Sequence, residues 1–464
     1  MPKKRPNILL IVADDMGYGD FSFVNGGLTQ TPALDALAAG GITLSQHYSA
    51  SPVCAPARAA LLTGRYPHRT GAIDTLDIRG LDRIALREKT LADLLKAQGY
   101  ATGLVGKWHN GALDRRYHPN ARGFDEFAGF CGGWQDYYRW RLDKNGTHHG
   151  ADGRYLTDVF TTEAVEFIRR HRQGPFFLTL AYNAPHFPLQ APGEDVHPFS
   201  ATGNHTLGVS ILYGMIRRMD IGIGRVLETL DECGLTDDTL VIFTSDNGPQ
   251  FGGDGQWSTT RFNCDLRGCK CTVWEGGIRV PAILRWLAGL EGGGRTLDCF
   301  VHFTDYLPTL LAVAGAEPPT EIALDGENVL PALRGERDST NPRRFWQWNR
   351  YTPVNLCNAA MRDGQWKLVY PGIAEAMHLV PGEAKRDKAS KYEPEQFPEI
   401  IREPMPVRDI PGPHPPELFK LDDDPCEQHN LADARPDRVA KMRRELEEWF
   451  NAVEADRASI DDRW

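Results

Sequence analysis

The chain has 464 residues, of which 41% are hydrophobic and 25% are charged, and its formal net charge is −10. That length exceeds what one ordinary hydrophobic core serves, so we expect a globular protein with one large domain and one smaller one. The negative charge argues against general nucleic-acid binding, which relies on basic residues. An anionic ligand would therefore need a local positive site made by Arg, Lys, His or a metal ion.

The start of the chain imitates a secretory signal only superficially. Lys3, Lys4 and Arg5 precede an apolar run at 8–13, but the run is short and ends in Asp14 and Asp15. We interpret it as a buried strand. The protein is expected to be cytoplasmic as written, or secreted or periplasmic if a signal has been removed. No stretch is long enough to span a membrane, so no membrane partner is expected.

The nine cysteines show no paired spacing and do not predict a disulfide framework in a chain this long. Cys269 and Cys271 are too close together for a Cys-x-x-Cys redox or zinc motif. We expect most of the cysteines to be reduced.

Apolar runs and helical segments alternate through the first part of the chain, where a continuous apolar run is typical of a parallel strand covered on both faces. The predicted strands are 8–13, 42–44, 100–105, 175–182 and 239–244. The predicted helices are 31–39, 56–63, 90–97, 158–171 and 207–233. This order predicts an α/β fold with a large, mostly parallel (mixed) β-sheet sandwiched by helices.

The pattern changes near residue 335, so we divide the chain into a catalytic α/β domain at 1–335 and a smaller α+β subdomain at 336–464. Asp363-Gly364 is typical of a hairpin turn. The subdomain is predicted to be a small antiparallel sheet with one helix, from strands at 344–348, 359–362, 366–370 and 418–421 and a helix at 436–453. A proline-rich insertion at 371–416 lacks periodicity, and loops of that length are usually functional or disordered.

Two of the predicted strands end in oxygen ligands. Asp14 and Asp15 follow the first strand, and Asp246 and Asn247 follow the strand at 239–244. Ligands of open α/β sheets sit at this carboxyl edge, and adjacent carboxylates repel each other unless a cation lies between them. Oxygen ligands suit Ca²⁺ or Mg²⁺ rather than zinc. An isolated Asp-Asp pair is more often a turn or a helix cap, so these residues alone leave both interpretations open.

The segment 51–65 places a cysteine beside a helix N-terminus. Pro56 suits the first helical position and Gly64 suits the residue after the helix end. Cys54 therefore precedes a helix whose N–H groups and dipole favour anionic chemistry, and Arg58 lies about one turn further on. A buried cysteine and a surface arginine remain the commoner interpretation of these two residues alone.

The run from Cys54 to Arg58, Cys-Ala-Pro-Ala-Arg, followed by Leu-Thr-Gly-Arg, resembles the signature of the formylglycine-dependent sulfatases of the alkaline phosphatase superfamily. One departure is Ala57, where the family usually has serine. The similarity continues in order through 14–15, 106–109, 184–186, 245–248 and the block around Lys270. In that last block Cys269 and Cys271 stand where the family prefers small residues.

This resemblance implies a cofactor set and a division of labour. A formylglycine-generating maturation enzyme would oxidise Cys54, and the hydrated aldehyde, a gem-diol, would attack sulfur. One Ca²⁺ would be held by Asp14, Asp15, Asp246, Asn247 and residue 54. The cationic set implied by the resemblance is Arg58, Lys107, His109, His186 and Lys270. Of these, Arg58 would hold the diol, His186 and Lys270 would assist the leaving oxygen, and His109 with Lys107 would promote expulsion of sulfate.

The sequence indicates the substrate less clearly than the reaction. Trp134 and Tyr137 lie in one aromatic-rich segment, and Trp346, Trp348 and Arg350 lie in another. Such residues are ordinary in core strands, but as pocket walls they suit stacking on sugar rings. We expect a sulfated saccharide, with small sulfate esters also accepted, and we expect the segment 346–351 with the insertion 371–416 to cover the mouth of the site.

Two alternatives stay open at this point. The first is a phosphonate or phosphate ester hydrolase of the same superfamily, which would share the nucleophile and the metal. The second is a non-catalytic saccharide-binding protein with an unmodified Cys54.

Overall fold

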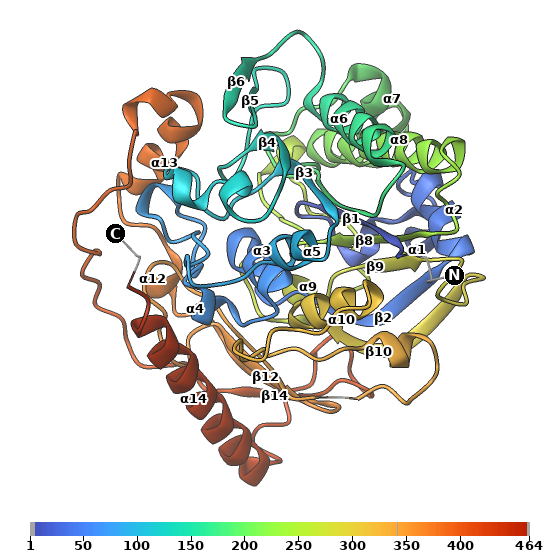
Figure 1. Cartoon of the computed structure of the whole chain (residues 1–464). Coiled ribbons are helices and arrows are strands. Elements are labelled where there is room, and N and C mark those ends of the chain that lie inside the picture. The colour runs from blue at the N-terminus through green and yellow to red at the C-terminus, as the bar shows by residue number, and fades with distance from the viewer. Residues whose placement is uncertain (1–4, 341, 462–464) are drawn as a thin grey trace.

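The computed structural model describes residues 5–340 and 342–461, and two β-sheets organise them (Figure 1). A mixed sheet of ten strands is flanked by helices, and a second sheet of four antiparallel strands lies beside it. The fold class predicted from the sequence is therefore confirmed. Lys3 and Lys4, which entered the comparison with a secretory signal, lie outside the described residues.

The large sheet has the strand order β10-β2-β9-β8-β1-β7-β3-β4-β5-β6. Its centre, from β8 to β4, is parallel, whereas β9 is antiparallel to both of its neighbours and β5 and β6 form an antiparallel edge. Its strands are β1 (Asn7–Ala13), β2 (Ile42–Tyr48), β3 (Ala101–Lys107), β4 (Glu126–Phe130), β5 (Arg141–Lys144), β6 (Thr147–Gly150), β7 (Phe176–Ala181), β8 (Thr239–Ser245), β9 (Ala282–Arg285) and β10 (Arg295–His302).

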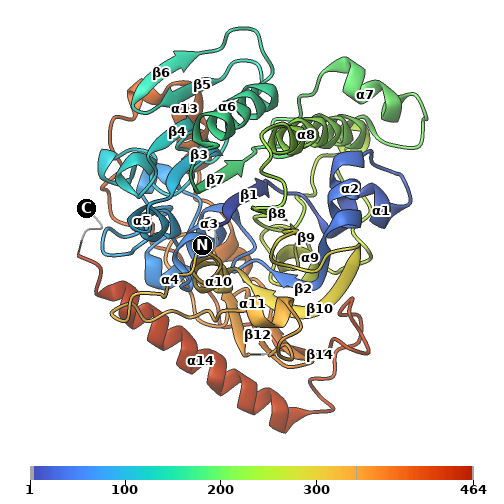
Figure 2. The ribbon, with the colours of Figure 1, turned by 45° about the vertical axis from the view of Figure 1, so that its right-hand side comes forward.

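Every residue of β1 is buried, because helices cover both faces of the sheet. Ile8, Leu10 and Val12 point into one core and Leu9 and Ile11 into the other, as the alternation of side chains along a strand requires. The first core is closed by α3 (Cys54–Thr63), α5 (Leu91–Ala97) and α10 (Tyr306–Val313), and the second by α2 (Pro32–Gly40), α6 (Leu156–His171) and α8 (Leu207–Glu232), as Figure 2 shows. The central strand is thus a rigid support for the two aspartates at its carboxyl end.

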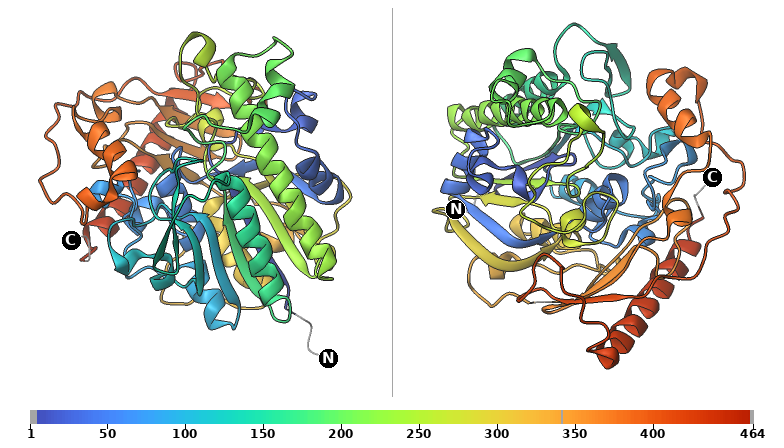
Figure 3. Two further views of the ribbon diagram at one scale, coloured as in Figure 1. Left: turned by 90° about the horizontal axis from the view of Figure 1, so that it is seen from above. Right: turned by 180° about the vertical axis from the view of Figure 1, so that it is seen from behind.

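The small sheet has the order β11-β12-β13-β14 and carries the last helix, α14. Met442, Leu446 and Val453 of α14 pack on Leu368 and Leu418 of the sheet, and Figure 3 (right) shows this helix in red along the orange strands. The bounds are β11 (Arg344–Gln347), β12 (Ala359–Asp363), β13 (Trp366–Tyr370), β14 (Glu417–Lys420) and α14 (Pro436–Ala458). The predicted division of the chain at residue 335 stays a prediction.

A buried ion cluster joins the small sheet to the large one. Lys367 of β13 lies 2.8 Å from Glu275 and 2.9 Å from Glu427, and all three side chains are buried. Tyr48 of β2 donates to Glu275 at 2.7 Å. Removing one partner of such a cluster leaves a buried charge uncompensated, at a cost of about 3–5 kcal/mol.

The proline-rich insertion contains a helix that the sequence did not predict, α13 (Glu383–Tyr392), with α12 (Ala374–Met377) before it. Ion pairs hold α13 on the 3₁₀ turn η2 (Asp77–Arg79): Arg79 pairs with Glu383, and Lys391 pairs with Asp77. Because charges rather than an apolar stripe dock this helix, the hydrophobic pattern gave no signal for it.

The remaining helices are short. They are α1 (Ser22–Asn25), α4 (Pro67–Thr70), α7 (Gly193–Ser200), α9 (Glu275–Ile278) and α11 (Leu330–Leu333), with 3₁₀ turns η1 (Tyr18–Asp20), η3 (Arg115–Tyr117), η4 (Pro119–Ala121), η5 (Gly255–Trp257), η6 (Phe303–Asp305) and η7 (Pro394–Gln396). None of the helices in the described ranges is both long and apolar enough to cross a bilayer. All nine cysteines fall within those ranges, and each is a free thiol.

Candidate active site

Four adjacent parallel strands of the large sheet, β8, β1, β7 and β3, end on the same edge. In the register of β1 with β8, Ala13 lies opposite Ser245, so the residues that come after the two strands meet. Asp246 confirms this closeness, because its N–H donates to the Ala13 carbonyl at 3.1 Å. The four strand ends deliver Asp14, Asp15, Lys107, His109, His186, Asp246 and Asn247.

The carboxylates form a compact buried centre. Oxygen atoms of Asp14, Asp15 and Asp246 all lie within 4.8 Å of one another. Asn247 donates from Nδ2 to Asp15 Oδ1 at 2.7 Å. Its own Oδ1 and Asp14 Oδ1 are buried and find no hydrogen-bond partner among the described residues. Burial raises the pKa of Asp14 to about 7. Unpartnered, buried oxygen atoms that converge on one place suit a hard divalent cation.

A cationic side chain approaches each of the three carboxylates. Lys107 Nζ lies 2.7 Å from Asp14 Oδ2, and Lys270 Nζ lies 2.6 Å from Asp15 Oδ1. Arg58 donates from Nε to Asp246 Oδ2 at 2.9 Å. Burial opposes ionisation of Asp15, but Lys270 and then His186 hold its pKa below the usual range. The centre is therefore ringed by positive charge, as an anionic substrate requires.

Cys54 is the first residue of α3, so the helix begins two residues before the predicted start at Pro56. Gly64 ends this helix with φ 69°, and its N–H donates to the Ala60 carbonyl, as the sequence predicts. Cys54 Sγ lies within 4.8 Å of an Asp14 oxygen and a His186 ring nitrogen. Burial raises the pKa of the Cys54 thiol, although Lys107 lowers it. An unmodified Cys54 is thus a neutral thiol and a poor nucleophile.

The two ring nitrogens of His109 have different surroundings. Its Nε2 lies 3.1 Å from the Thr75 carbonyl, which only accepts, so the proton is on Nε2. Nδ1 is left unprotonated, and within the described part of the chain it has no partner. Burial, and after it Lys107, hold the pKa of His109 well below its usual range. The backbone of His109 has φ 56°, a left-handed conformation found at functional sites.

His186 is held from its other side. Its Nδ1 lies 2.7 Å from the Phe187 carbonyl, which fixes the proton on Nδ1, and its Nε2 lies 3.7 Å from Asp15. Tyr137 supports this loop, because its hydroxyl lies 2.7 Å from the Asn183 carbonyl and 2.9 Å from the His186 carbonyl. Burial and then Lys270 hold the pKa of His186 well below its usual range.

The family model described as Sulfatase matches residues 6–316, a stretch that contains all of these strand ends and Cys54. The chain belongs to the sulfatase family. It is therefore a sulfuric ester hydrolase of the alkaline phosphatase superfamily, and the family predicted from the sequence is confirmed.

Relatives and solved structures agree with this assignment. Human N-acetylgalactosamine-6-sulfatase is 34% identical, over 82% of this chain and 75% of that protein. Rat steryl-sulfatase is 32% identical, over 80% of this chain and 77% of that protein. The crystal structure of Ps i-CgsB in complex with k-i-k-neocarrahexaose is 32% identical with a TM-score of 0.80, covering 96% of this chain and 93% of that one.

Backbone hydrogen bonds connect the block around Lys270 in this sulfatase to the segment after Asn247 and to the segment before Cys54. The N–H of Lys270 donates to the Pro249 carbonyl at 3.0 Å, and that of Cys271 donates to the Pro52 carbonyl at 2.9 Å. Burial raises the pKa of Cys269, and it raises that of Cys271 to about 11. The two thiols that flank Lys270 are therefore neutral and add no charge to the site.

Three of the aromatic residues predicted to wall a sugar pocket are buried instead. Tyr137 is fully buried under the His186 loop, and Trp346 and Trp348 are 1% and 2% exposed. Trp346 donates to the Ser49 carbonyl at 2.7 Å. These rings pack the interior and have no free face for a sugar, so the expectation for them is corrected. Trp134 is half-buried, with its ring centroid 6.0 Å from that of Phe187, beside His186.

Arg350 also has a structural position. Its Nη1 donates to Asp74 Oδ1 at 2.9 Å and to Thr75 Oγ1 at 2.7 Å, and its guanidinium lies over the Trp348 ring. Thr75 is the residue whose carbonyl accepts from His109. Arg350 and His109 thus contact the same residue, Thr75. Sequence reasoning missed Asp74 and Thr75, since no motif marks a backbone carbonyl as a partner.

Proposed function

We propose that this sulfatase hydrolyses a sulfate ester on a carbohydrate, with formylglycine made from Cys54 and one bound Ca²⁺. The observation that carries the proposal is Cys54 at a helix N-terminus, within 4.8 Å of Asp14 and His186 beside a buried carboxylate centre. The names of human N-acetylgalactosamine-6-sulfatase and of the Ps i-CgsB complex with a neocarrahexaose support a saccharide as the substrate. The name of rat steryl-sulfatase points instead to a steroid.

The residues that would hold the ion are Asp14, Asp15, Asp246 and Asn247, with residue 54 completing the set. Their donors are oxygen atoms, and two of them are buried without a partner in the part of the chain that the structure describes, which fits Ca²⁺ and does not suit zinc. When bound, the ion would neutralise charge on the sulfuryl oxygens. The maturation enzyme must reach Cys54 before folding is complete, because the folded chain leaves it only 2% exposed.

Formylglycine would supply, once hydrated, one hydroxyl to attack sulfur and a second whose loss of a proton re-forms the aldehyde and expels sulfate with the first oxygen. The side chains of this protein act around it. Arg58 and Lys107 provide fixed positive charge for the sulfuryl group in a site from which water is excluded. Burial would lower the pKa of Lys270, but Asp15 raises it above its usual range, so Lys270 stays charged and can donate a hydrogen bond to the leaving oxygen. The His186 side chain lies beside that of Lys270, since both approach Asp15.

His109 takes the last proton in this proposal. Its Nδ1 is unprotonated because Nε2–H is committed to the Thr75 carbonyl, and a neutral imidazole is a competent general base. Burial, and after it the charge of Lys107 two residues earlier, lowers the pKa of His109 and keeps it neutral. The orientation of His109 therefore depends on Thr75, and through it on Arg350.

The test is a screen for sulfate release. The parent protein, produced with a formylglycine-generating enzyme, is assayed on chondroitin sulfate, heparan sulfate and ι-carrageenan tetrasaccharides, on a steroid sulfate, and on matched aryl sulfate and aryl phosphonate esters. We expect release from a saccharide and from the aryl sulfate, and none from the Cys54→Ala variant. Preference for the phosphonate, or for the steroid sulfate over every saccharide, would contradict the proposal.

A further inference from the structure

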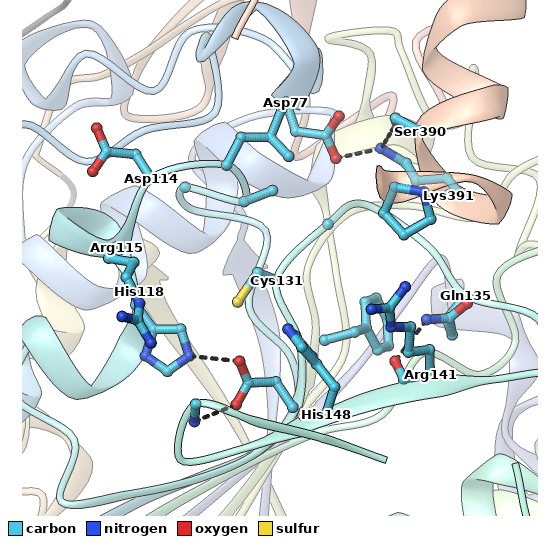
Figure 4. Close-up of a pocket in the computed structure, with 18 of the residues that line it drawn as sticks. Asp77, Asp114, Arg115, His118, Cys131, Gln135, Arg141, His148, Ser390 and Lys391 are labelled. Atoms are coloured by element: carbon cyan, nitrogen blue, oxygen red, sulfur yellow. Dashed lines mark hydrogen bonds and ion pairs between the residues drawn. The ribbon is translucent and has the colours of Figure 1, made fainter. Parts of the chain in front are cut away.

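A cavity of about 740 Å³ lies beside the candidate active site, between the segment after β3 and the helix α13 of the insertion (Figure 4). Pockets of this size hold ligands of several hundred cubic ångströms, which is more than a single sulfate group needs. Its lining side chains include Arg115, Trp134, Arg141, His148, Lys391 and Glu395. Neither the motifs of the chain nor the proposed reaction assigns a role to this cavity.

The cavity and the active site share a wall, the segment Cys131 to Trp134. Cys131 and Gly132 line the cavity, and the Cys131 carbonyl accepts from the N–H of His109 at 3.1 Å. A Cβ atom on Gly133 would lie only 2.8 Å from the His109 ring. Only the backbone of this segment therefore separates the cavity from His109.

Trp134 lies at the junction of the two spaces. It lines the cavity, and its ring also contacts those of Phe187, next to His186, and Tyr392 of α13, with centroid distances of 6.0 and 5.4 Å. The Phe187 and Tyr392 side chains are 42% and 43% exposed. An aromatic rim of this kind offers flat apolar faces to the rings of a sugar.

Two of the carboxylates that line the cavity, Asp77 and Asp114, pair with a lysine and an arginine. Asp77 pairs with Lys391, and Asp143 lies 3.2 Å from His118. Asp114 pairs with Arg116 at 2.7 Å. Burial lowers the pKa of His118, so His118 is neutral near pH 7 and the charge of Asp143 is not balanced by it.

Two arginines of the cavity, Arg115 and Arg141, are open to an anion. Arg115 makes no ion pair within the described ranges of the chain. Arg141 lies 3.5 Å from Glu395, but these side chains are 52% and 68% exposed, and exposed pairs of this kind contribute little. An incoming anion can replace Glu395 at Arg141. A guanidinium binds sulfate or carboxylate oxygens through two parallel hydrogen bonds.

We propose that this cavity binds a second, anionic sugar unit of a sulfated oligosaccharide while the scissile sulfate lies at Cys54. Arg115 and Arg141 bind the sulfate or carboxylate of that unit, and the rim around Trp134 supports the sugar ring between the two positions. The inference rests on the proposed function, since it concerns the same substrate. It would give a chain with a net charge of −10 two arginines with which to bind a polyanion.

The experiment compares the double variant Arg115→Ala/Arg141→Ala with Arg139→Ala, whose side chain is 81% exposed and does not line the cavity. Each is assayed on an aryl sulfate and on the chondroitin sulfate, heparan sulfate and ι-carrageenan tetrasaccharides. For the tetrasaccharide that the parent cleaves best, the double variant should lose about 10- to 100-fold in kcat/KM, as expected for lost charged hydrogen bonds. Aryl sulfate turnover should stay within about twofold, and Arg139→Ala should behave as the parent.

Binding of the same three tetrasaccharides is measured by calorimetry in a Cys54→Ala background, which separates the cavity from the chemistry. The double variant should raise the Kd of the best-bound tetrasaccharide about tenfold or more, and Arg139→Ala should leave it unchanged. If the parent released no sulfate from any substrate, the proposed function would be overturned. The calorimetric binding measurement would still test the cavity. Failure of all three tetrasaccharides to bind, or equal binding to the double variant and the control, would overturn the inference.

Discussion

Replacing Arg350 by alanine should lower the turnover of every substrate, because Arg350 holds the residues that orient His109. Its Nη1 is shared between Asp74 Oδ1 and Thr75 Oγ1, at 2.9 and 2.7 Å. Asp74 is fully buried, and the Thr75 carbonyl accepts from His109 Nε2. The sequence predicted a sugar contact for Arg350, and that prediction implies a loss on saccharides alone. A positioning role and a sugar contact for Arg350 therefore predict different losses of activity.

The size of the effect can be worked out from the contacts. Removing one partner of a buried ion pair costs about 3–5 kcal/mol, and a hydrogen bond to a charged group contributes about 1.5–3 kcal/mol. The Arg350 side chain is 20% exposed, and Asp74 keeps the N–H donors of Thr75 and Tyr351. We therefore expect the free energy of unfolding to fall by about 2 kcal/mol, below the range for a fully buried ion pair and within that for one charged hydrogen bond. General base catalysis contributes about 100- to 10,000-fold, so misorienting His109 should lower kcat about tenfold.

The assay measures kcat and KM on an aryl sulfate and on a saccharide sulfate, together with urea unfolding. Arg350→Ala should lower kcat equally on both substrates, with little change in KM. Arg350→Lys keeps the charge and should recover part of both the stability and kcat. A rise in KM confined to the saccharide, with normal kcat on the aryl sulfate, would refute the positioning role.

Four further outcomes are expected. Gly133→Ala should lower kcat sharply, because its Cβ would lie 2.8 Å from the His109 ring, whereas Gly150→Ala, with open space around it, should not; equal rates would count against the shared wall. Cys54→Ser should accumulate a sulfated serine detectable by mass spectrometry and turn over at most once, so repeated turnover near the parent rate would contradict the two-hydroxyl mechanism. Exhaustive chelation should abolish activity and lower the melting temperature, both restored by Ca²⁺; a fully active, unshifted metal-free protein would exclude the ion. Burial lowers the pKa of His47 to about 4. Between about pH 6.5 and pH 4 the unfolded chain therefore binds a proton at this residue that the folded chain does not. As the pH is lowered through this range, the free energy of unfolding should fall by about 1.4 kcal/mol for each pH unit. Replacing His47 with Gln should flatten that slope, and an unchanged slope would assign it to other groups.

The sequence predicted the centre of the fold because its signals there are local. The run that became β1 is apolar throughout and ends in two aspartates, and parallel neighbours bring their ends to one edge, so Asp14 and Asp246 met as expected. β9 (Ala282–Arg285) was missed, since four residues in an antiparallel position between β8 and β2 carry no periodicity of their own.

The surroundings of the site could not be predicted in the same way. Trp346 looks the same in composition whether it faces a sugar or the Ser49 carbonyl, and only packing decides between the two. Helix α13 depends on Arg79 and Asp77, which lie about three hundred positions earlier in the chain. The cavity draws on the same distant segments. Contacts of this range leave no pattern in a single sequence.

The measurement that tests the central claim most directly is mass spectrometry of the peptide that contains Cys54, on preparations made with and without a formylglycine-generating enzyme. The account predicts that sulfate release per chain rises in proportion to the fraction of residue 54 found as formylglycine. It also predicts that protein carrying only the thiol is inactive, because burial keeps that thiol neutral. Full activity in a preparation whose residue 54 is entirely the free thiol would contradict it.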